Sequence, residues 1–406
     1  MSQNNKKKQT TVRRRARLSL RYYDYNLLAG VILLTCFGLV MLYSTSAYEA
    51  EANFGDDMFY FRKQALISAA CLVMVLIGSQ IDYHIFVKFA PALYVVANIL
   101  LIITKYVGTE AYGAKRWLKF GPLSFQPAEL AKVAIILYLP MVIVKLGRNM
   151  KGIKAPAVVL GLGAFTSFCT FYFTDNLSTA LIIAGITVIL IFVAHPQTKP
   201  FVIGGTALFV AVVAGVRYFA STLDGSDNFR LRRLIVWLDP EAYSEIGGYQ
   251  ILQALYAIGS GGFFGKGLGN STQKLSALPE AQNDTIFAVI CEELGVFGAA
   301  MLTLMFVFLL YRLLFIAQNA PDLLGSLIVT GIFAHIALQV ILNIMVVINL
   351  IPTTGITLPF VSYGGTSVLF LMVEMAIALS VSRQIRLKEE EDPAKLQEEY
   401  VAGRIR

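Results

Sequence analysis

Charged side chains are scarce in this chain of 406 residues: 15% are Lys, Arg, Asp or Glu, whereas 56% are hydrophobic. Soluble domains usually carry about 25% charged residues, because that many are needed to cover their surface. The mean hydropathy of +0.65 points the same way. The composition therefore excludes an ordinary soluble protein and indicates an integral membrane protein.

Residues for metal and disulfide chemistry are also few. The three histidines lie far apart in the sequence: His84, His195 and His335. The four cysteines lie in apolar stretches without C-x-x-C spacing: Cys36, Cys71, Cys169 and Cys291. We predict neither a metal site nor a disulfide framework, and interpret the cysteines as small buried hydrophobic residues. The first apolar stretch is too long for a cleaved signal peptide and lacks an A-x-A-like site, which predicts an uncleaved anchor.

Long apolar runs dominate the rest of the chain. A helix needs about 20 apolar residues to cross a membrane. Ten runs satisfy this requirement approximately: 26–47, 64–81, 88–106, 125–145, 155–173, 178–196, 200–220, 284–312, 326–349 and 364–384. They are too long for the strands of an outer-membrane barrel. The predicted fold class is therefore all-α, a polytopic membrane protein with about ten transmembrane helices.

Basic residues set the predicted orientation, because Lys and Arg favour the cytoplasmic side. They concentrate in the N-terminal tail, the 145–154 loop and the C-terminal tail, so both termini are expected in the cytoplasm. The predicted organisation is a basic tail at 1–22, a ten-helix membrane domain at 23–384 and a charged tail at 385–406. A loop at 221–283 is expected on the extracytoplasmic side, and loops of that length are usually functional. The net charge of +8 suits anionic lipids better than nucleic acid.

Two predicted external loops carry basic residues against this trend: Lys115, Arg116 and Lys119, then Arg230, Arg232, Arg233, Lys266 and Lys274. Such residues suggest a lipid phosphate or pyrophosphate as ligand. Ion pairs with Glu110, Asp239 or Glu280 are the alternative. Glycines between 259 and 269 could bring backbone N–H groups to an anion or only permit tight packing. They do not form a Walker motif, since Ser260 and Gly267 occupy two of its defining positions.

Asp284 is the strongest catalytic candidate by position, at the entrance to the 284–312 span and four residues after Glu280. A carboxylate there could accept a proton from a sugar hydroxyl in a partly dry environment. Capping the helix is the structural alternative, and the two roles are compatible. Glu129 and Lys132 share a helix face and are either functional or a mutual pair. The same ambiguity applies to Asp175, Glu292, Glu293, His335 and Glu374.

Several long motifs occur in a fixed order along the membrane portion: GAKRWL at 113–118, QPAELAK at 126–132, TDNLSTA at 174–180, FRLRRLIVWLDP at 229–240, GGYQ at 247–250, AIGSGGFFGKGLG at 257–269, LPEAQNDTIFAVICEELG at 278–295 and LIPTTGITLPFVSYGGTS at 350–367. Through these motifs the chain resembles the SEDS family (shape, elongation, division and sporulation), which includes FtsW, RodA and SpoVE. The match covers essentially the whole membrane portion. Family members often have His-Thr where this chain has Gln282 and Asn283.

The resemblance implies a peptidoglycan glycosyltransferase that polymerises lipid II at the outer face of the bacterial cytoplasmic membrane. It implies that Asp284 is the catalytic carboxylate. The expected substrate-binding residues are Lys115, Arg116, Trp117, Glu129, Lys132, Arg230, Arg233, Lys266, Glu280 and Ser362. Inverting transfer would release undecaprenyl pyrophosphate, and a lipid-facing cavity is expected near the 200–220 span. No cofactor is indicated with certainty, and assistance by a divalent cation, Mg²⁺ or Mn²⁺, is left open.

The implied partners are lipid II, a class B penicillin-binding protein with transpeptidase activity, and other membrane proteins of the divisome. The opening of the chain looks more like FtsW than RodA, which favours a role in cell division at the septum. An elongation role like that of RodA or a sporulation role like that of SpoVE is the alternative within the family. A lipid II flippase and an inactive divisome scaffold are the rivals from other functional classes. Polar residues gather toward the outer side and no internal repeat is evident, which favours an enzyme over a transporter.

Overall fold

The computed structural model describes residues 22–111, 114–120, 123–197, 229–275, 278–279 and 281–386, together with isolated residues between 199 and 215. Within these residues, nine helices are long and apolar enough to cross a membrane. They are α2 (Tyr25–Phe54), α3 (Phe59–Gly78), α4 (Tyr83–Val107), α5 (Pro127–Leu146, continued by the 3₁₀ turn η1, Gly147–Lys151), α6 (Lys154–Thr174), α7 (Leu177–Ala194), α11 (Ile286–Asn319), α12 (Leu323–Val347) and α13 (Gly365–Arg383).

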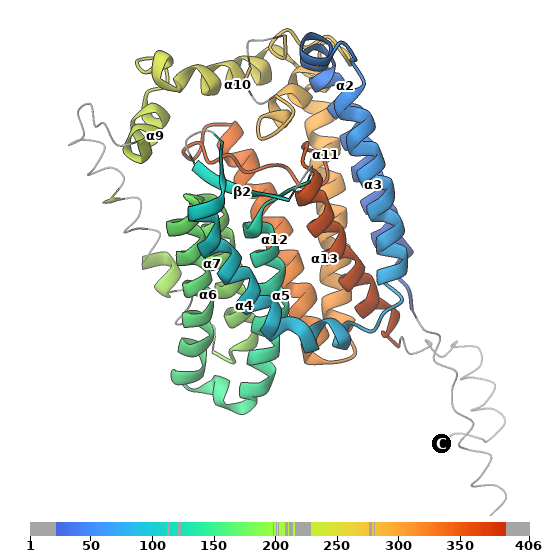
Figure 1. Cartoon of the computed structure of the whole chain (residues 1–406), viewed down its shortest axis with the longest axis vertical. Coiled ribbons are helices and arrows are strands. Elements are labelled where there is room, and N and C mark those ends of the chain that lie inside the picture. Colours follow the sequence, from blue (N-terminus) through green and yellow to red (C-terminus); the bar gives the residue numbers. More distant parts are fainter. Residues whose placement is uncertain are drawn as a thin grey trace, which may run out of the picture.

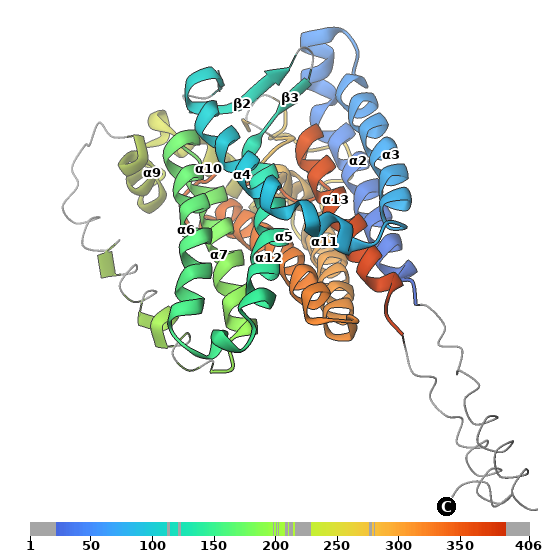
Figure 2. The same cartoon turned by 60° about the horizontal axis from the view of Figure 1, so that its bottom comes forward.

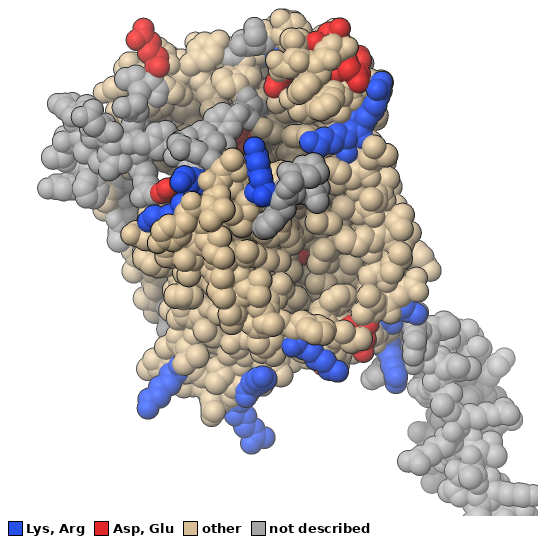
Figure 3. Space-filling view, in the orientation of Figure 1, with Lys and Arg blue, Asp and Glu red and all other residues tan. Residues whose placement is uncertain are grey.

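Polar residues define where several of these helices begin. Asp24, Asn176 and Asp322 each accept a hydrogen bond from a backbone N–H in the first turn of the helix that follows. Such caps satisfy donors that have no partner within the helix. Between the helix ends the visible surface is almost free of charge, and Lys and Arg gather at the two ends (Figure 3). This distribution is the one that a hydrocarbon layer requires.

The bundle is centred on α5, α12 and α13, which are the most buried spans. Helices α2 and α3 pack beside α11 and α13, while α4, α6 and α7 form the opposite side (Figures 1 and 2). We call the end of the bundle that carries α10 in Figure 1 the upper end and the opposite end the lower end. The sequence predicts that the upper end faces outward.

A small antiparallel sheet lies at the upper end, in addition to the predicted helices. Its strands are β1 (Thr109–Ala111), β2 (Ala114–Phe120) and β3 (Leu123–Phe125), in the order β1-β2-β3. The middle strand β2 contacts α4, α5 and α6. The all-α fold class is confirmed, and the sheet is an insertion that helix-length apolar runs could not reveal.

The two ends of the described chain meet at the lower end, where the Tyr22 N–H donates to the Ile385 carbonyl at 3.2 Å. The predicted span at 200–220 lies largely outside the described residues, as do most of the two predicted tails. The described part of the predicted loop at 221–283 contains two helices, α9 (Phe229–Leu238) and α10 (Gly248–Ser260), with the short turn η2 (Ser244–Ile246) between them. The helices of this segment lie at the upper end (Figure 1).

Candidate functional site

Asp284 lies two residues before α11, half-buried at the upper end. Three hydrogen bonds hold the backbone around it. The Asn343 side chain donates to the Asp284 carbonyl at 2.9 Å, the Ser362 hydroxyl donates to the Asn283 carbonyl at 2.6 Å, and the Tyr363 N–H donates to the Gln282 carbonyl at 2.9 Å. The segment 282–284 is therefore fixed by α12 and by the connection between α12 and α13, rather than by helix α11 alone.

Two arginines from distant parts of the chain approach this segment. Burial lowers the pKa of Arg233 on α9, and the negative charge of Asp284 opposes that shift. Burial, followed by repulsion from Arg233, lowers the pKa of Arg116 on β2, while Asp175 raises it. These mutual influences place Arg116, Arg233, Asp175 and Asp284 in one electrostatic neighbourhood, since Coulomb interactions weaken with distance and are largely screened beyond about 10 Å in salt solution.

Main-chain carbonyls orient the two guanidinium groups. Arg116 donates to the Asp175 carbonyl at 3.0 Å, and Arg233 donates to the Thr353 carbonyl at 3.3 Å. The Nε atom of Arg116 is buried without a hydrogen-bond partner among the described residues. A guanidinium group has five N–H donors, so Arg116 retains capacity for a further acceptor. The arrangement can receive an anion beside a carboxylate.

The alternation of strand β2 explains why Arg116, and not its neighbours, takes part. Side chains on a strand point alternately to opposite faces. Arg116 shares its face with the buried Leu118, toward the bundle, whereas Lys115, Trp117 and Lys119 share the other face. Lys115 and Lys119 are exposed.

Lys266 and Lys274 have carboxylate partners of their own. Lys266 pairs with Glu292 and Lys274 pairs with Glu293, each at 2.7 Å, and both glutamates are fully buried. Ser271 donates to Glu292 as well. The pairing partners expected from the sequence were Glu110, Asp239 and Glu280, so the glutamates that the structure places here are different ones. These contacts attach the segment 266–274 to the first turns of α11.

The glycine-rich segment lies tightly against the same helix. A Cβ on Gly265 would stand 2.1 Å from the Glu293 carbonyl oxygen, and one on Gly261 would stand 2.0 Å from that of Cys291. Helix α11 is interrupted opposite them at Gly295, whose φ is +67°. Of the two interpretations left open by the sequence, these contacts favour close packing.

Glu129 and Lys132 form an ion pair of 2.9 Å inside the bundle, where both side chains are buried. Lys132 also donates to Gln339 on α12 at 3.2 Å. Ser362 contacts the protein itself, since it accepts from the Leu358 N–H at 2.8 Å besides donating to Asn283. Glu280 and the side chain of Arg230 lie outside the described parts of the chain.

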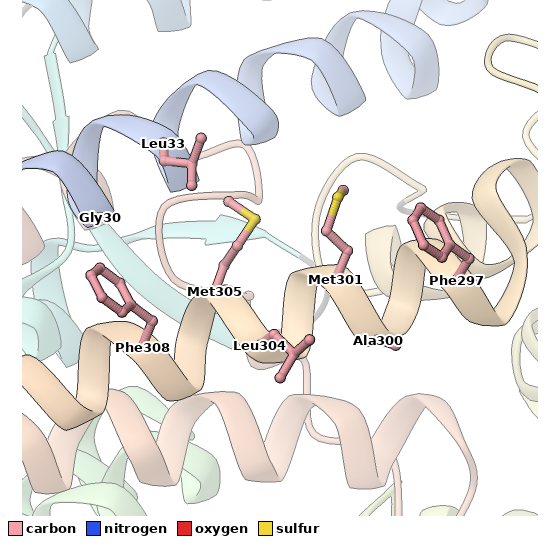
Figure 4. A pocket seen from close by; sticks show the side chains of 8 residues that line it. All are labelled: Gly30, Leu33, Phe297, Ala300, Met301, Leu304, Met305 and Phe308. Atoms are coloured by element: carbon pink, nitrogen blue, oxygen red, sulfur yellow. The ribbon is translucent and has the colours of Figure 1, made fainter.

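Two hollows lie away from this cluster. A groove of about 400 Å³ between α2 and α11 is lined only by glycine, alanine and large apolar side chains, among them Leu33, Met301, Met305 and Phe308 (Figure 4). A larger, polar pocket of about 760 Å³ lies at the lower end, beside Asp82 and Arg383. The groove has no group for acid–base chemistry, and the pocket lies at the opposite end from Asp284.

No group of three or more His, Cys, Asp and Glu side chains suited to a metal ion occurs among the described residues. Mg²⁺ is commonly held by one or two carboxylates together with substrate phosphates. Asp284 beside an anion site would meet that minimal requirement, so assistance by a divalent cation stays a prediction.

The sequence is similar to known proteins along almost its whole length. It matches the FtsW/RodA/SpoVE family, described as cell cycle protein, over residues 25–387. The chain belongs to this family. It is 36% identical to stage V sporulation protein E of Bacillus subtilis, covering 89% of this chain and 98% of that protein. It is 33% identical to the probable peptidoglycan glycosyltransferase FtsW of Geobacter sp. strain M18, covering 90% and 98% respectively.

Solved structures show the same architecture in other members of the family. One chain of a peptidoglycan synthase complex, which coordinates polymerization and crosslinking, superposes with a TM-score of 0.74 at 25% identity, over 90% of this chain and 99% of that one. The rod shape determining protein RodA of Thermus thermophilus superposes with a TM-score of 0.64 at 24% identity, over 90% and 98%. The predicted family and multi-pass membrane fold are confirmed, and the names of the FtsW relatives agree with the predicted enzyme class.

The sequence did not single out Asn343, Gln339 or Thr353, although each contacts a residue of the cluster or its support. The sequence does contain a pattern that could have identified Gln339 and Asn343. Together with His335 they recur at intervals of four in an otherwise apolar run. That spacing places them on one face of a helix.

Proposed function

We propose that this protein is a peptidoglycan glycosyltransferase that polymerises lipid II on the outer face of the cytoplasmic membrane. The observation that carries the proposal is a carboxylate, Asp284, fixed by its backbone at the upper end beside two half-buried arginines. The similarity to proteins named peptidoglycan glycosyltransferase supports the substrate class.

In the proposed reaction, Asp284 accepts the proton of the 4-hydroxyl of an acceptor GlcNAc. The hydroxyl oxygen forms a bond to C1 of the donor MurNAc, and the bond from C1 to the pyrophosphate oxygen breaks with inversion. The electron pair of the broken bond leaves with undecaprenyl pyrophosphate. A carboxylate is already in its basic form at neutral pH, and removal of bulk water strengthens its interaction with the hydroxyl.

Arg116 and Arg233 are proposed to bind the pyrophosphate. The two groups repel each other, so an anion bound between them offsets that repulsion. Guanidinium N–H groups can donate to phosphate oxygens, and such charge-assisted bonds stabilise the leaving group as its charge grows. Eight further residues stay predictions as substrate-binding residues: Lys115, Trp117, Arg230, Lys266, Glu280, Glu129, Lys132 and Ser362. The ion pairs of Lys266 and Lys132 and the backbone contacts of Ser362 give these three a structural task as well.

A class B penicillin-binding protein is the proposed partner, supported by the match to a chain of a peptidoglycan synthase complex. Cytoplasmic termini, other divisome proteins and a septal location are part of the same proposal. The named relatives include both FtsW and a sporulation protein. A division role is preferred because the opening segment YDYNLLAGVILLTCFGLVMLYSTSA resembles that of FtsW.

The deciding experiment is polymerisation of labelled lipid II by the purified protein with its transpeptidase partner, wild type beside Asp284→Asn. Glycan ladders from the wild type and at least a hundredfold fewer products from the variant are expected, because a general base contributes roughly 10²–10⁴ in rate. Equal expression and equal thermal unfolding of the two proteins serve as the control. An active Asp284→Asn variant would overturn the base assignment. Bound lipid II without ladders from either protein would favour the flippase or the scaffold.

A further inference from the structure

Three amide and imidazole side chains form a continuous polar stripe on helix α12. His335, Gln339 and Asn343 lie one helical turn apart, and each is almost completely buried, at 1%, 2% and 1% exposure. We call these three residues the α12 ladder. Polar groups inside a membrane bundle are costly unless each has a partner, so the contacts of every rung identify what the ladder holds.

The top rung joins the catalytic segment to the connection between α12 and α13. The Asn343 amide nitrogen donates to the Asp284 carbonyl at 2.9 Å and to the Ile356 carbonyl at 2.7 Å. An amide nitrogen has two hydrogens, so both are used. One side chain therefore fixes the distance between the backbone of Asp284 and the backbone of residue 356.

The middle rung holds the next carbonyl of the same connection. The Gln339 amide nitrogen donates to the Thr357 carbonyl at 3.0 Å, while its oxygen accepts from Lys132 at 3.2 Å and lies 2.8 Å from Nε2 of His335. Lysine can only donate and a carbonyl can only accept, so the orientation of the amide follows from its two neighbours.

The bottom rung balances the charge of the ladder. Because the Gln339 oxygen only accepts, Nε2 of His335 must carry a hydrogen. Nδ1 of His335 lies 2.9 and 2.8 Å from the two oxygens of Glu374, so one proton is held between these groups. Whichever group carries it, the His335–Glu374 pair has no net charge. The Lys132–Glu129 pair beside it is neutral in the same way, which satisfies the requirement for charge inside a bilayer.

We propose that Asn343 and Gln339 are positioning residues for the glycosyl transfer. They hold two successive carbonyls of the 356–357 backbone, and Asn343 holds Asp284 against them. Gly355 lies at the face of the Asp284 carboxylate, since a Cβ there would stand 3.7 Å from its Oδ2. The ion-paired residues that contact the lower rungs, Glu129 and Lys132 on α5 and Glu374 on α13, thus support the segment of Asp284 through the ladder. This inference rests on the proposed function, because only a reaction at Asp284 gives such positioning a purpose.

The test replaces donors by acceptors of the same shape. Gln339→Glu still accepts from Lys132 and His335 but loses the donor to Thr357, and Asn343→Asp loses at least one of its two donors. A matched control is Ile341→Met, at a lipid-facing position of the same helix that is 52% exposed. Gln339→Met, close in shape and without hydrogen bonds, replaces Gln339→Glu if the added carboxylate prevents folding.

Both ladder variants are expected to lower kcat for glycan synthesis by about 10- to 100-fold, as misplacement of a reacting group by about 1 Å does. Their KM for lipid II should stay within about threefold, since substrate contacts are not removed. Amide hydrogen exchange over residues 284–290 and 353–358 should accelerate by about tenfold, because backbone groups open more often when their side-chain anchors are lost. The control should change none of these quantities.

Wild-type kcat and wild-type exchange in both ladder variants would overturn the inference. A rise in KM alone would also overturn it, because the residues would then bind substrate rather than position Asp284. If the wild-type protein forms no glycan, the proposed function fails. Hydrogen exchange still decides in that case whether the ladder fixes Asp284, with unchanged exchange rejecting it.

Discussion

The buried arginines have different contacts at the two ends of the bundle. At the lower end, Arg312 is paired with Asp24 at 2.7 Å, and Tyr22 also contacts its guanidinium group. At the upper end, Arg116 and Arg233 contact main-chain carbonyls and also repel each other. A buried cation with a dedicated carboxylate is a structural ion pair, whereas the proposed function assigns the two neighbouring arginines of the upper end to an anionic ligand.

Removal of the Asp24 carboxylate at the lower end should therefore destabilise the protein. Asp24→Asn leaves the Arg312 guanidinium buried without its counter-charge, which costs roughly 3–5 kcal/mol in comparable buried pairs. Thermal unfolding in detergent measures the loss, and the double variant Asp24→Asn with Arg312→Met should recover most of it. An Asp24→Asn protein as stable as the wild type would remove the distinction between the two ends.

A substitution in the arginine pair of the upper end should impair the use of lipid II rather than the stability of the protein. Arg233→Gln is expected to lower kcat/KM for lipid II by about tenfold or more, since one charge-assisted contact to phosphate contributes about 1.5–3 kcal/mol. Stability should stay within about 1 kcal/mol, because the change also relieves repulsion on Arg116. Steady-state polymerisation at several lipid II concentrations, beside thermal unfolding, separates the two effects.

Lys119→Gln is the matched control for that experiment. Lys119 is exposed and lies on the opposite face of β2 from Arg116, so its loss should change kcat/KM by less than about twofold. Equal losses from Lys119→Gln and Arg233→Gln would indicate general attraction of an anionic lipid instead of a defined anion site.

The smallest expected effect is a pH dependence at the lower end. Burial alone would raise the pKa of Asp82, but hydrogen bonds from the His84 backbone, Gln384 and the His84 ring outweigh it and lower the pKa. A carboxyl with a lowered pKa in the folded state adds stability above its unfolded pKa of about 3.9, and this contribution disappears as the pH falls through the folded value. Asp82→Asn should therefore flatten the loss of thermal stability between about pH 5 and pH 3 by a small amount. If Asp82→Asn and the wild type lose thermal stability equally as the pH falls, Asp82 contributes nothing to that loss.

Most of the fold could be predicted from the sequence, because nine of the ten long apolar runs coincide with helices that the structure describes, and an apolar run that crosses a bilayer must form a helix there. The small sheet at 109–125 was not readable, since short strands that pair only with one another leave no periodic signal of that length. The sequence predicted several basic residues in external loops but not their partners. In the structure, Lys266 forms an ion pair with Glu292, and Lys274 forms one with Glu293. The structure placed Arg233 close to Asp284, and Arg116 close to Arg233 and Asp175. Pairings of this kind depend on which loop reaches which helix, which no local pattern encodes.

The sequence by itself determined that this chain spans a membrane, belongs to its family and carries Asp284 at a helix entrance, because composition, motif order and position are properties of the chain alone. Only the tertiary structure decided which charges meet. Arg116 and Arg233 come together through a strand and a helix far apart in sequence. The α12 ladder reaches Asp284 because α12 packs beside α11. Side-chain hydrogen bonds act over about 3 Å, so their partners are set by packing and not by order along the chain.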